Sequence, residues 1–158
     1  MRNFFRLAAL AAASTTAATG SAPAAPVAST PAAERTVVRD AAALARLRRN
    51  SGISLQWISF EAPARGHVRV TDRGGLVHLS GAQSGNGGEL RLEGDVLSID
   101  AASFTFRGTI SIVDTPDAGR NCLRDGEFEF RVTQRRRYWR LQQMEACDGL
   151  TDYVDIYF

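Results

Sequence analysis

Residues 104–112 read FTFRGTISI, a run in which large apolar side chains occupy most of the alternate positions. Successive side chains of an extended strand point to opposite faces, so one face of this run is apolar and the other is polar. The apolar face consists of Phe104, Phe106, Ile110 and Ile112. Such a pattern is typical of a β-strand that packs on a core with one face and meets water with the other.

The same alternation recurs along the chain from residue 53 to the C-terminus. Gly, Asp, Asn and Pro separate the runs, as in Asp72–Gly75 and Gly85–Gly88, and these residues favour tight turns. The pattern predicts an all-β fold, an antiparallel meander of eight or nine short strands closed as a barrel or folded as a sandwich. The alternating apolar positions outside 104–112 are Ile53, Leu55, Trp57, Val68, Val70, Val77, Leu79, Leu90, Leu92, Phe128, Phe130, Val132, Trp139, Leu141, Val154, Ile156 and Phe158.

Before residue 53 the apolar residues recur with the period of a helix rather than at every second position. Apolar residues between positions 41 and 47 fall on one stripe, and arginines fall on the other side. Asp40 is placed to cap the first turn, and Asn50-Ser51-Gly52 is a suitable end. We expect a short N-terminal helix over residues 39–50 of a single β domain, residues 39–158.

The first 38 residues have the composition of an export signal and a linker. Arg2 and Arg6 precede a short apolar run, and Ala22-Pro23-Ala24 offers small residues at a cleavage site. The apolar run is too short to span a membrane. We predict a signal peptide over residues 1–24, a disordered Ala/Pro-rich tether over 25–38, and a periplasmic or secreted domain without a transmembrane span.

Two cysteines remain in the exported part, Cys122 and Cys147. An oxidising compartment favours a disulfide between them. In a meander, the loop before the Phe128 strand and the loop after the Trp139 strand lie at the same end of the sheet. The order of the strands therefore places the two cysteines close enough to bridge.

The charge of the chain excludes some classes of function. The chain has 19 basic residues, all arginine, and 17 acidic residues. Removal of Arg2 and Arg6 leaves 17 arginines, so the exported part is neutral, which argues against general nucleic-acid binding. The absence of lysine excludes Schiff-base and lysine-base chemistry.

Several motifs toward the C-terminus resemble a set of small exported bacterial proteins of unknown function. These motifs are DTPDAGRNC at 114–122, YWRLQ at 138–142, Cys147, and DYVDIYF at 152–158. The resemblance covers the last third of the chain well and Leu55-Gln56-Trp57-Ile58 more loosely. It implies an exported domain whose C-terminal strand matters, and it implies no activity.

The most distinctive polar cluster is Arg135, Arg136, Arg137, Tyr138 and Arg140. A hairpin tip at 134–136 would gather these guanidinium groups at one end of the barrel, where they suit phosphate or carboxylate, and an aromatic ring could stack on a ligand. The alternative is that Glu127 and Glu129, on the preceding strand, neutralise the arginines.

Other candidate sites rest on weaker patterns. Asp114, Asp117, Asp148 and Asp152 lie in the two loops next to the cysteines and could hold Ca²⁺, although Asp is also a common turn residue. The two histidines, His67 and His78, could approach one another across the turn at 72–75 and form a metal site with Asp72 or Glu89. The alternative is that both are surface residues.

These observations favour a non-catalytic binding module for a small anionic ligand or an envelope protein, without a cofactor. The inward aromatic residues are large enough to fill a small barrel, so recognition is expected at the rim or surface. One alternative is an envelope hydrolase with an aspartate or metal site at the disulfide end. Another is a structural or inhibitory protein that pairs through its C-terminal strand, with Tyr153 and Tyr157 on the outer face.

Overall fold

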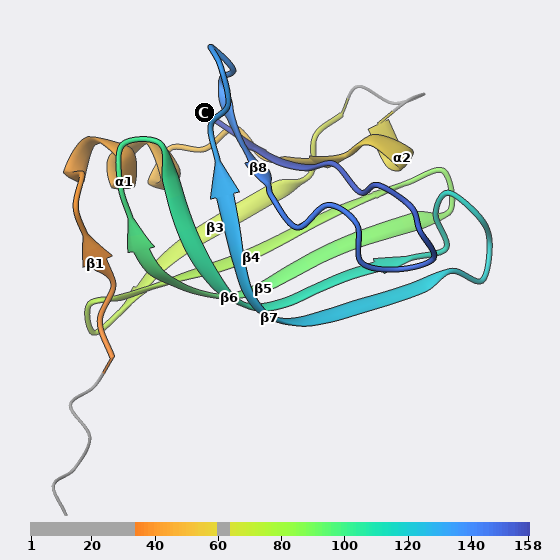
Figure 1. The fold of residues 1–158 in the computed structure, drawn as a ribbon, viewed down its shortest axis with the longest axis horizontal. Helices are drawn as coiled ribbons and strands as arrows, with labels where there is room; N and C mark the ends of the chain where they lie inside the picture. Colours follow the sequence, from red (N-terminus) through yellow and green to blue (C-terminus); the bar gives the residue numbers. More distant parts are fainter. Residues whose placement is uncertain (1–33, 60–63) are drawn as a thin grey trace, which may run out of the picture. The chain divides into compact units, whose positions relative to one another are not determined.

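The computed structural model describes residues 34–59 and 64–158. Mostly antiparallel strands form a nearly closed eight-stranded barrel with two short helices, which confirms the predicted all-β fold (Figure 1). The strands of the barrel follow one another in space in the order β2-β9-β8-β7-β6-β5-β4-β3. Their bounds are β2 Ile53–Leu55, β3 His67–Arg73, β4 Leu76–Gly85, β5 Gly88–Ile99, β6 Ser103–Val113, β7 Asn121–Arg131, β8 Tyr138–Leu141 and β9 Val154–Tyr157.

The barrel closes at the junction of β2 with the start of β3. Ile53 and Gly66 exchange two backbone hydrogen bonds, at 2.8 and 3.3 Å. The side chain of Gln83 on β4 extends this junction, because its oxygen accepts from the Leu55 N–H and its nitrogen donates to the Ala64 carbonyl. One buried amide thus satisfies backbone groups that a continuous ladder would otherwise pair.

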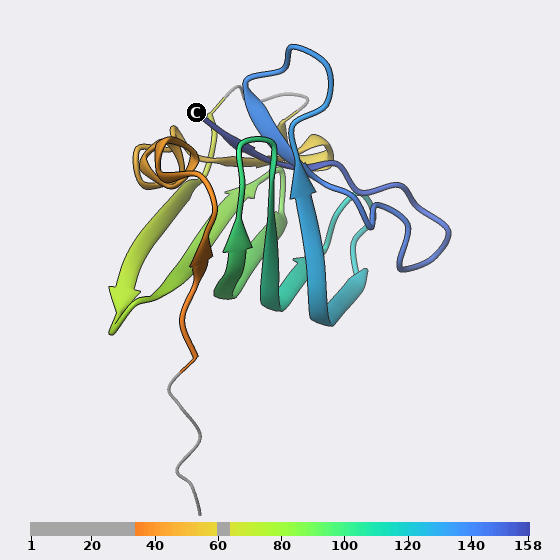
Figure 2. The same cartoon turned by 60° about the vertical axis from the view of Figure 1, so that its left-hand side comes forward.

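Helix α1 (Ala41–Arg48) lies inside the predicted range, and the Asp40 carboxylate caps it by accepting from the Ala43 N–H at 2.7 Å. Just after the helix, the Asn50 amide donates to the Val68 carbonyl on β3 at 3.0 Å. The helix and its C-terminal residues therefore cover part of the edge that β3 leaves unpaired (Figure 2).

Two segments differ from the sequence-based expectation. Val37–Val38, placed in the tether, form strand β1 and pair in parallel with β5. Trp57, expected on a strand, lies in the short helix α2 (Gln56–Ser59), where its indole N–H reaches Asp152 at 3.0 Å. The predicted signal peptide and most of the tether lie outside the described residues. No helix among the described residues is long and apolar enough to cross a membrane.

Aromatic side chains occupy the middle of the barrel. Phe104 stacks on Phe130 with ring centroids 4.9 Å apart, and Trp139 meets Phe104 edge-on at 5.7 Å. Phe106 packs against Phe130 at 6.2 Å. All four side chains are buried, as the alternation predicts.

A row of inward-facing glycines crosses three strands. Gly94 on β5 pairs with Gly108 on β6, which pairs with Gly126 on β7. A Cβ on Gly108 would meet the Glu93 carbonyl, the Gly94 Cα at 2.6 Å and the Phe106 ring at 2.9 Å. The strands approach closely here beneath the Phe106 ring, an arrangement common where barrel strands bend.

We therefore expect Gly108→Ala to lower the free energy of unfolding by about 2 kcal/mol, because the added methyl group overpacks a site with backbone on two sides. The adjacent, outward-facing Thr109→Ala serves as a control and should change stability by less than about 0.5 kcal/mol. Urea unfolding followed by circular dichroism measures both. Equal effects of the two substitutions would contradict the close packing of the glycine row.

The predicted disulfide is present between Cys122 and Cys147. Cys122 is the second residue of β7 rather than part of the loop before it, and Cys147 lies in the segment between β8 and β9. The bridge therefore ties the start of β7 to the long connection that leads into the C-terminal strand.

Candidate functional site

Strands β8 and β9 place tyrosine and arginine on the outer face of the barrel. The inward side chains Trp139 and Ile156 are fully buried. The alternate positions face outward and pair across the two strands, Tyr138 with Tyr157 and Arg140 with Asp155. The Tyr138 and Tyr157 rings lie 5.2 Å apart, so the alternation that builds the core also builds an aromatic pair outside it.

Arg140 is fixed at the centre of this surface. Its Nε and Nη2 donate to the two carboxylate oxygens of Asp155, each at 2.7 Å. The guanidinium also lies over the Tyr153 ring at 4.2 Å and the Tyr138 ring at 5.2 Å. The hydrogen bonds that Asp155 accepts raise the pKa of Arg140. This bidentate pair organises the tyrosines, and its charge is already compensated.

Two further arginines lie over the tyrosine pair, one over each ring. Arg65, in the segment before β3, lies over the Tyr157 ring at 3.7 Å and donates to the Ser51 hydroxyl at 2.9 Å. Arg136 lies over the Tyr138 ring at 5.6 Å. Within residues 34–59 and 64–158, neither arginine forms an ion pair with a carboxylate. We call the surface formed by Arg65, Arg136, Tyr138, Arg140, Tyr153 and Tyr157 the arginine–tyrosine face.

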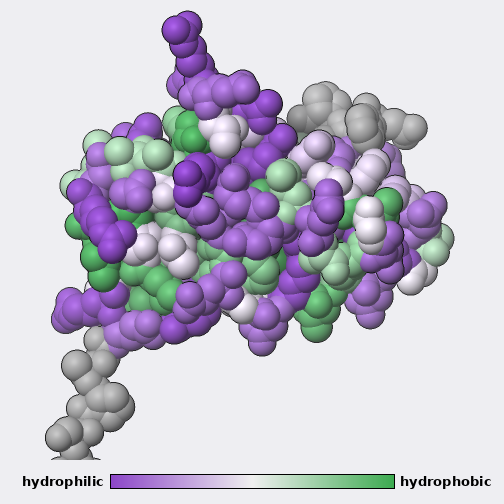
Figure 3. Space-filling model, viewed as in Figure 1, coloured by the Kyte–Doolittle hydropathy of each residue, from purple (hydrophilic) through white to green (hydrophobic). Residues whose placement is uncertain are grey.

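The β7–β8 hairpin projects above this face and ends in a hydrophilic tip (Figures 1 and 3). Arg135 and Arg137 are exposed there, and no ion pair with another described residue holds them. The turn forms at Gln134, which has a φ of 59°, with the Arg136 N–H bonded to the Thr133 carbonyl. The structure thus brings Arg136, Tyr138 and Arg140 together and leaves Arg135 and Arg137 at the tip.

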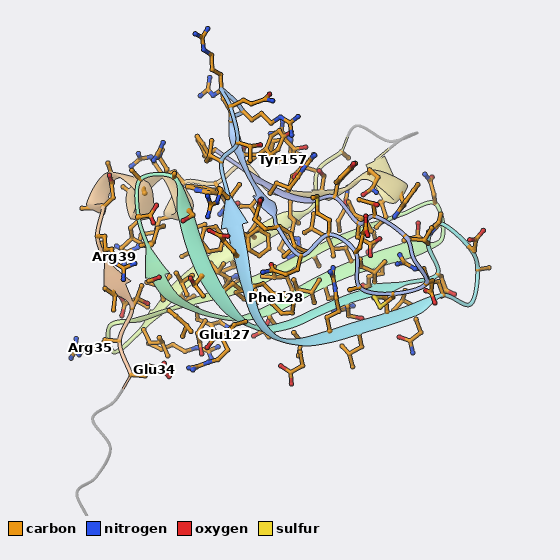
Figure 4. All side chains as sticks on the ribbon, in the orientation of Figure 1. Glu34, Arg35, Arg39, Glu127, Phe128 and Tyr157 are labelled. Atoms are coloured by element: carbon orange, nitrogen blue, oxygen red, sulfur yellow. A yellow bond between two sulfur atoms is a disulfide. The ribbon has the colours of Figure 1, made fainter. Side chains whose placement is uncertain are left out.

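The acidic residues that could have neutralised the cluster are engaged elsewhere. Glu129 pairs with Arg131 on its own strand. Glu127 faces Arg107, which also forms an ion pair with Glu34. Figure 4 shows that Glu127 lies well apart from Tyr157. Neither glutamate therefore neutralises the arginines of the tip.

The aspartates considered for calcium do not form a cluster of free carboxylates. Asp114 accepts from the Gly119 N–H at 2.7 Å, whereas Asp148 and Asp152 both contact Arg120. Asp117 lines an open surface hollow of about 300 Å³ with Arg120 and Asp148. Among the described residues, no group of three or more His, Cys, Asp or Glu side chains is arranged to hold a metal ion. The calcium prediction therefore gains no support.

Arg120 is the centre of a buried network at the disulfide end, and sequence reasoning did not single it out. Its Nη1 and Nη2 donate to the two Asp152 oxygens, each at 3.0 Å, and Nη1 also reaches the Thr115 carbonyl at 3.1 Å. Asp152 is fully buried, and the hydrogen bonds that it accepts from Arg120 raise the pKa of that arginine. Every polar group here has a partner, which indicates a structural role.

Arg124 is buried with an incomplete set of partners. Its Nη1 donates to the Gln143 carbonyl at 2.8 Å, whereas Nε and Nη2 are buried and have no partner among the described residues. Burial lowers the pKa of this arginine. The alternation along β7 could have revealed its burial, because Arg124 occupies the same set of inward-facing alternate positions as Cys122 and Phe128.

The histidines are not cross-strand neighbours. His67 pairs with Ala82, and His78 pairs with Thr71, four residues further along β3. His78 is only 6 % exposed, so the expectation of a surface position is wrong for this residue. Its two ring nitrogens lie 2.8 Å from Asp95 and 2.6 Å from Glu93, which ties β4 to β5. Asp72 instead pairs with Arg48, and Glu89 with Arg91.

The C-terminal strand has no free edge. Strand β9 pairs with β2 on one side and with β8 on the other. A partner strand would have to displace one of these neighbours, so the geometry does not favour the hypothesis of pairing through this strand. Tyr153 and Tyr157 do face outward, as expected, and both belong to the arginine–tyrosine face.

Comparison with known proteins places this fold in a family. The model of the PM1083 family matches residues 35–158, a range that contains the nine strands of the described residues and both cysteines. The uncharacterized protein PM1083 of Pasteurella multocida (strain Pm70) is 42% identical over 107 residues, which are 66% of this chain and 69% of that protein. No solved structure matches. The chain therefore belongs to the PM1083 family.

Proposed function

We propose that this domain is an exported, non-catalytic binding module that recognises an oxyanion-bearing ligand through its arginine–tyrosine face. The observation that carries the proposal is the presence of Arg65 and Arg136 over a tyrosine pair, each without a carboxylate partner among the described residues. A guanidinium carries its N–H donors in a planar fork that matches phosphate or carboxylate.

The tyrosines support binding by holding the arginines in place. A free arginine loses side-chain entropy when it orders around a ligand, and stacking on a ring removes part of that loss in advance. Tyr157 is itself fixed, because its hydroxyl lies 2.9 Å from the Ser54 hydroxyl. The face therefore offers preorganised cations rather than a nucleophile with a base, which favours recognition over catalysis.

Export is part of the proposal, and two features support it. The signal-like composition of residues 1–24 is one, and the disulfide, which is stable in an oxidising compartment, is the other. Processing is tested by expression in a bacterial host and mass spectrometry of the periplasmic fraction, where a chain that starts near residue 25 is expected. Retention of the intact chain in the cytoplasm would contradict export.

We expect sodium phosphate to bind the folded domain at low ionic strength and the Arg65→Gln/Arg136→Gln double variant to bind at least about tenfold more weakly, since each substitution removes charge-assisted hydrogen bonds. The measurement is an NMR titration that follows amide shifts on β8 and β9. Arg69→Gln is the matched control, because Arg69 is an exposed arginine on β3 outside the face. Unchanged affinity in the double variant, or no binding to the native domain, would overturn the proposal.

A further inference from the structure

We infer that the ligand of the arginine–tyrosine face is a linear phosphate polymer that binds on both sides of the Tyr138–Tyr157 pair at once. The inference rests on the proposed function and specifies its ligand. It starts from the position of two cations that have no carboxylate partner among residues 34–59 and 64–158, Arg65 over one ring and Arg136 over the other. The centroids of these two rings are 5.2 Å apart.

The charge pattern along the face is that of a row rather than a single pocket. Asp155 compensates Arg140 in the middle, so the central part of the face is close to neutral. Positive charge without a described carboxylate partner remains at Arg65 on one side and at Arg136 on the other, and Arg135 and Arg137 extend the second side into the projecting hairpin. A single phosphate group has too few oxygens to pair with all of these arginines, whereas an extended anion can contact the arginines over both rings and in the hairpin at once.

The state of the tyrosine rings favours phosphate over a sugar-based polymer. Guanidinium groups lie over all three rings, those of Arg136 and Arg140 over Tyr138, that of Arg65 over Tyr157 and that of Arg140 over Tyr153. Rings covered in this way offer little free surface for stacking a sugar or a base. The stacked arginines still present N–H donors in their own planes, so the face is suited to a chain of oxyanions without rings.

Binding on both sides predicts a dependence on chain length. Once the first phosphate groups contact one arginine, the next segment of the same chain meets the other arginine at a high effective concentration. Tripolyphosphate and long-chain polyphosphate should therefore bind more tightly, per phosphate group, than orthophosphate does. A purely local site would show no such gain.

The test compares orthophosphate, tripolyphosphate and long-chain polyphosphate by isothermal titration calorimetry at one ionic strength. The proteins are the native domain, Arg65→Gln, Arg136→Gln and the control Arg69→Gln. For the native domain and the control we expect long-chain polyphosphate to bind about 100-fold more tightly per phosphate than orthophosphate. Each variant of the face should lose most of that gain and still bind orthophosphate through the remaining arginine. Thermal melts establish that all variants fold.

The outcomes separate the two proposals. Absence of orthophosphate binding to the native domain would overturn the proposed function together with this inference. Orthophosphate binding without a gain with length, or a gain that survives in both single variants, would overturn only the inference. Polygalacturonate, a carboxylate-bearing sugar polymer, is the last probe, and tighter binding to it than to long-chain polyphosphate would also overturn the inference.

Discussion

Arg120→Met is expected to lower the free energy of unfolding by about 3–5 kcal/mol, because it removes one partner of a buried ion pair and leaves the other unpaired. Asp152 is fully buried and receives two hydrogen bonds from Arg120. In the variant, the Trp57 indole N–H still donates to the Asp152 carboxylate. Urea unfolding measured by circular dichroism and tryptophan fluorescence gives the change in free energy.

Arg124→Met is the matched control, and its expected effect has the opposite sign or is close to zero. The two arginines are four residues apart and are about equally buried. They differ because two nitrogens of Arg124 have no hydrogen-bond partner among the described residues. Replacement of an unpaired buried charge by an apolar side chain of similar length removes a desolvation penalty. A loss of more than about 2 kcal/mol in Arg124→Met would contradict the incomplete hydrogen bonding of the Arg124 Nε and Nη2 atoms.

The double variant Arg120→Met/Asp152→Leu distinguishes the effect of losing the ion pair from the effect of leaving one buried charge without its partner. Because an apolar pair of similar volume can replace a buried ion pair at little cost, the double variant should recover much of the stability lost in Arg120→Met. If the double variant is no more stable than Arg120→Met, then Asp152 stabilises the domain through its other contacts, above all its hydrogen bond with Trp57.

Removal of the disulfide by Cys122→Ala/Cys147→Ala is expected to lower the free energy of unfolding by about 3 kcal/mol. The bridge closes a loop between residues 25 positions apart, and it stabilises the domain mainly by restricting the unfolded chain. Loss of two buried sulfur atoms adds a smaller packing term, since Cys122 is fully buried. The thermal midpoint and the urea midpoint of the double variant provide the measurement.

The control for the disulfide is the native protein in a thiol reductant. Reductant should shift the midpoint of the native domain toward that of the double variant and leave the double variant unchanged. An equal shift in both proteins would show that reductant acts elsewhere. A double variant as stable as the oxidised native domain would contradict the stabilising role of the bridge.

The alternation in residues 104–112 was sufficient to predict the β-fold because burial on one face of a strand repeats with the strand's own period. The proximity of the two cysteines could also be predicted, because in a meander the number of strands between two loops decides whether those loops lie at the same end of the sheet. The pairing of Val37 and Val38 with β5 could not be predicted, because two valines beside an Ala/Pro-rich segment are too few to show an alternating pattern.

The candidate site was only partly predictable. Arg136, Tyr138 and Arg140 are neighbours in the sequence, so a hairpin brings them together whatever the rest of the fold does. Arg65 joins them only because β2 pairs with β9, and that pairing joins segments about a hundred residues apart. The pairing of Arg120 with Asp152 also depends on tertiary structure, and the distribution of charge along the chain contains no sign of it.

The pairing of β2 with β9 has a consequence for how the chain acquires its structure during synthesis or export. Strands β3 to β7 can assemble from consecutive hairpins as they emerge, whereas Ile53 must wait for Ile156, its partner in the finished ladder. Long-range pairing of this kind is slow compared with hairpin formation. An early intermediate would therefore expose the apolar interior until the final residues arrive, and chaperone binding during that interval would be the cellular signature of this topology.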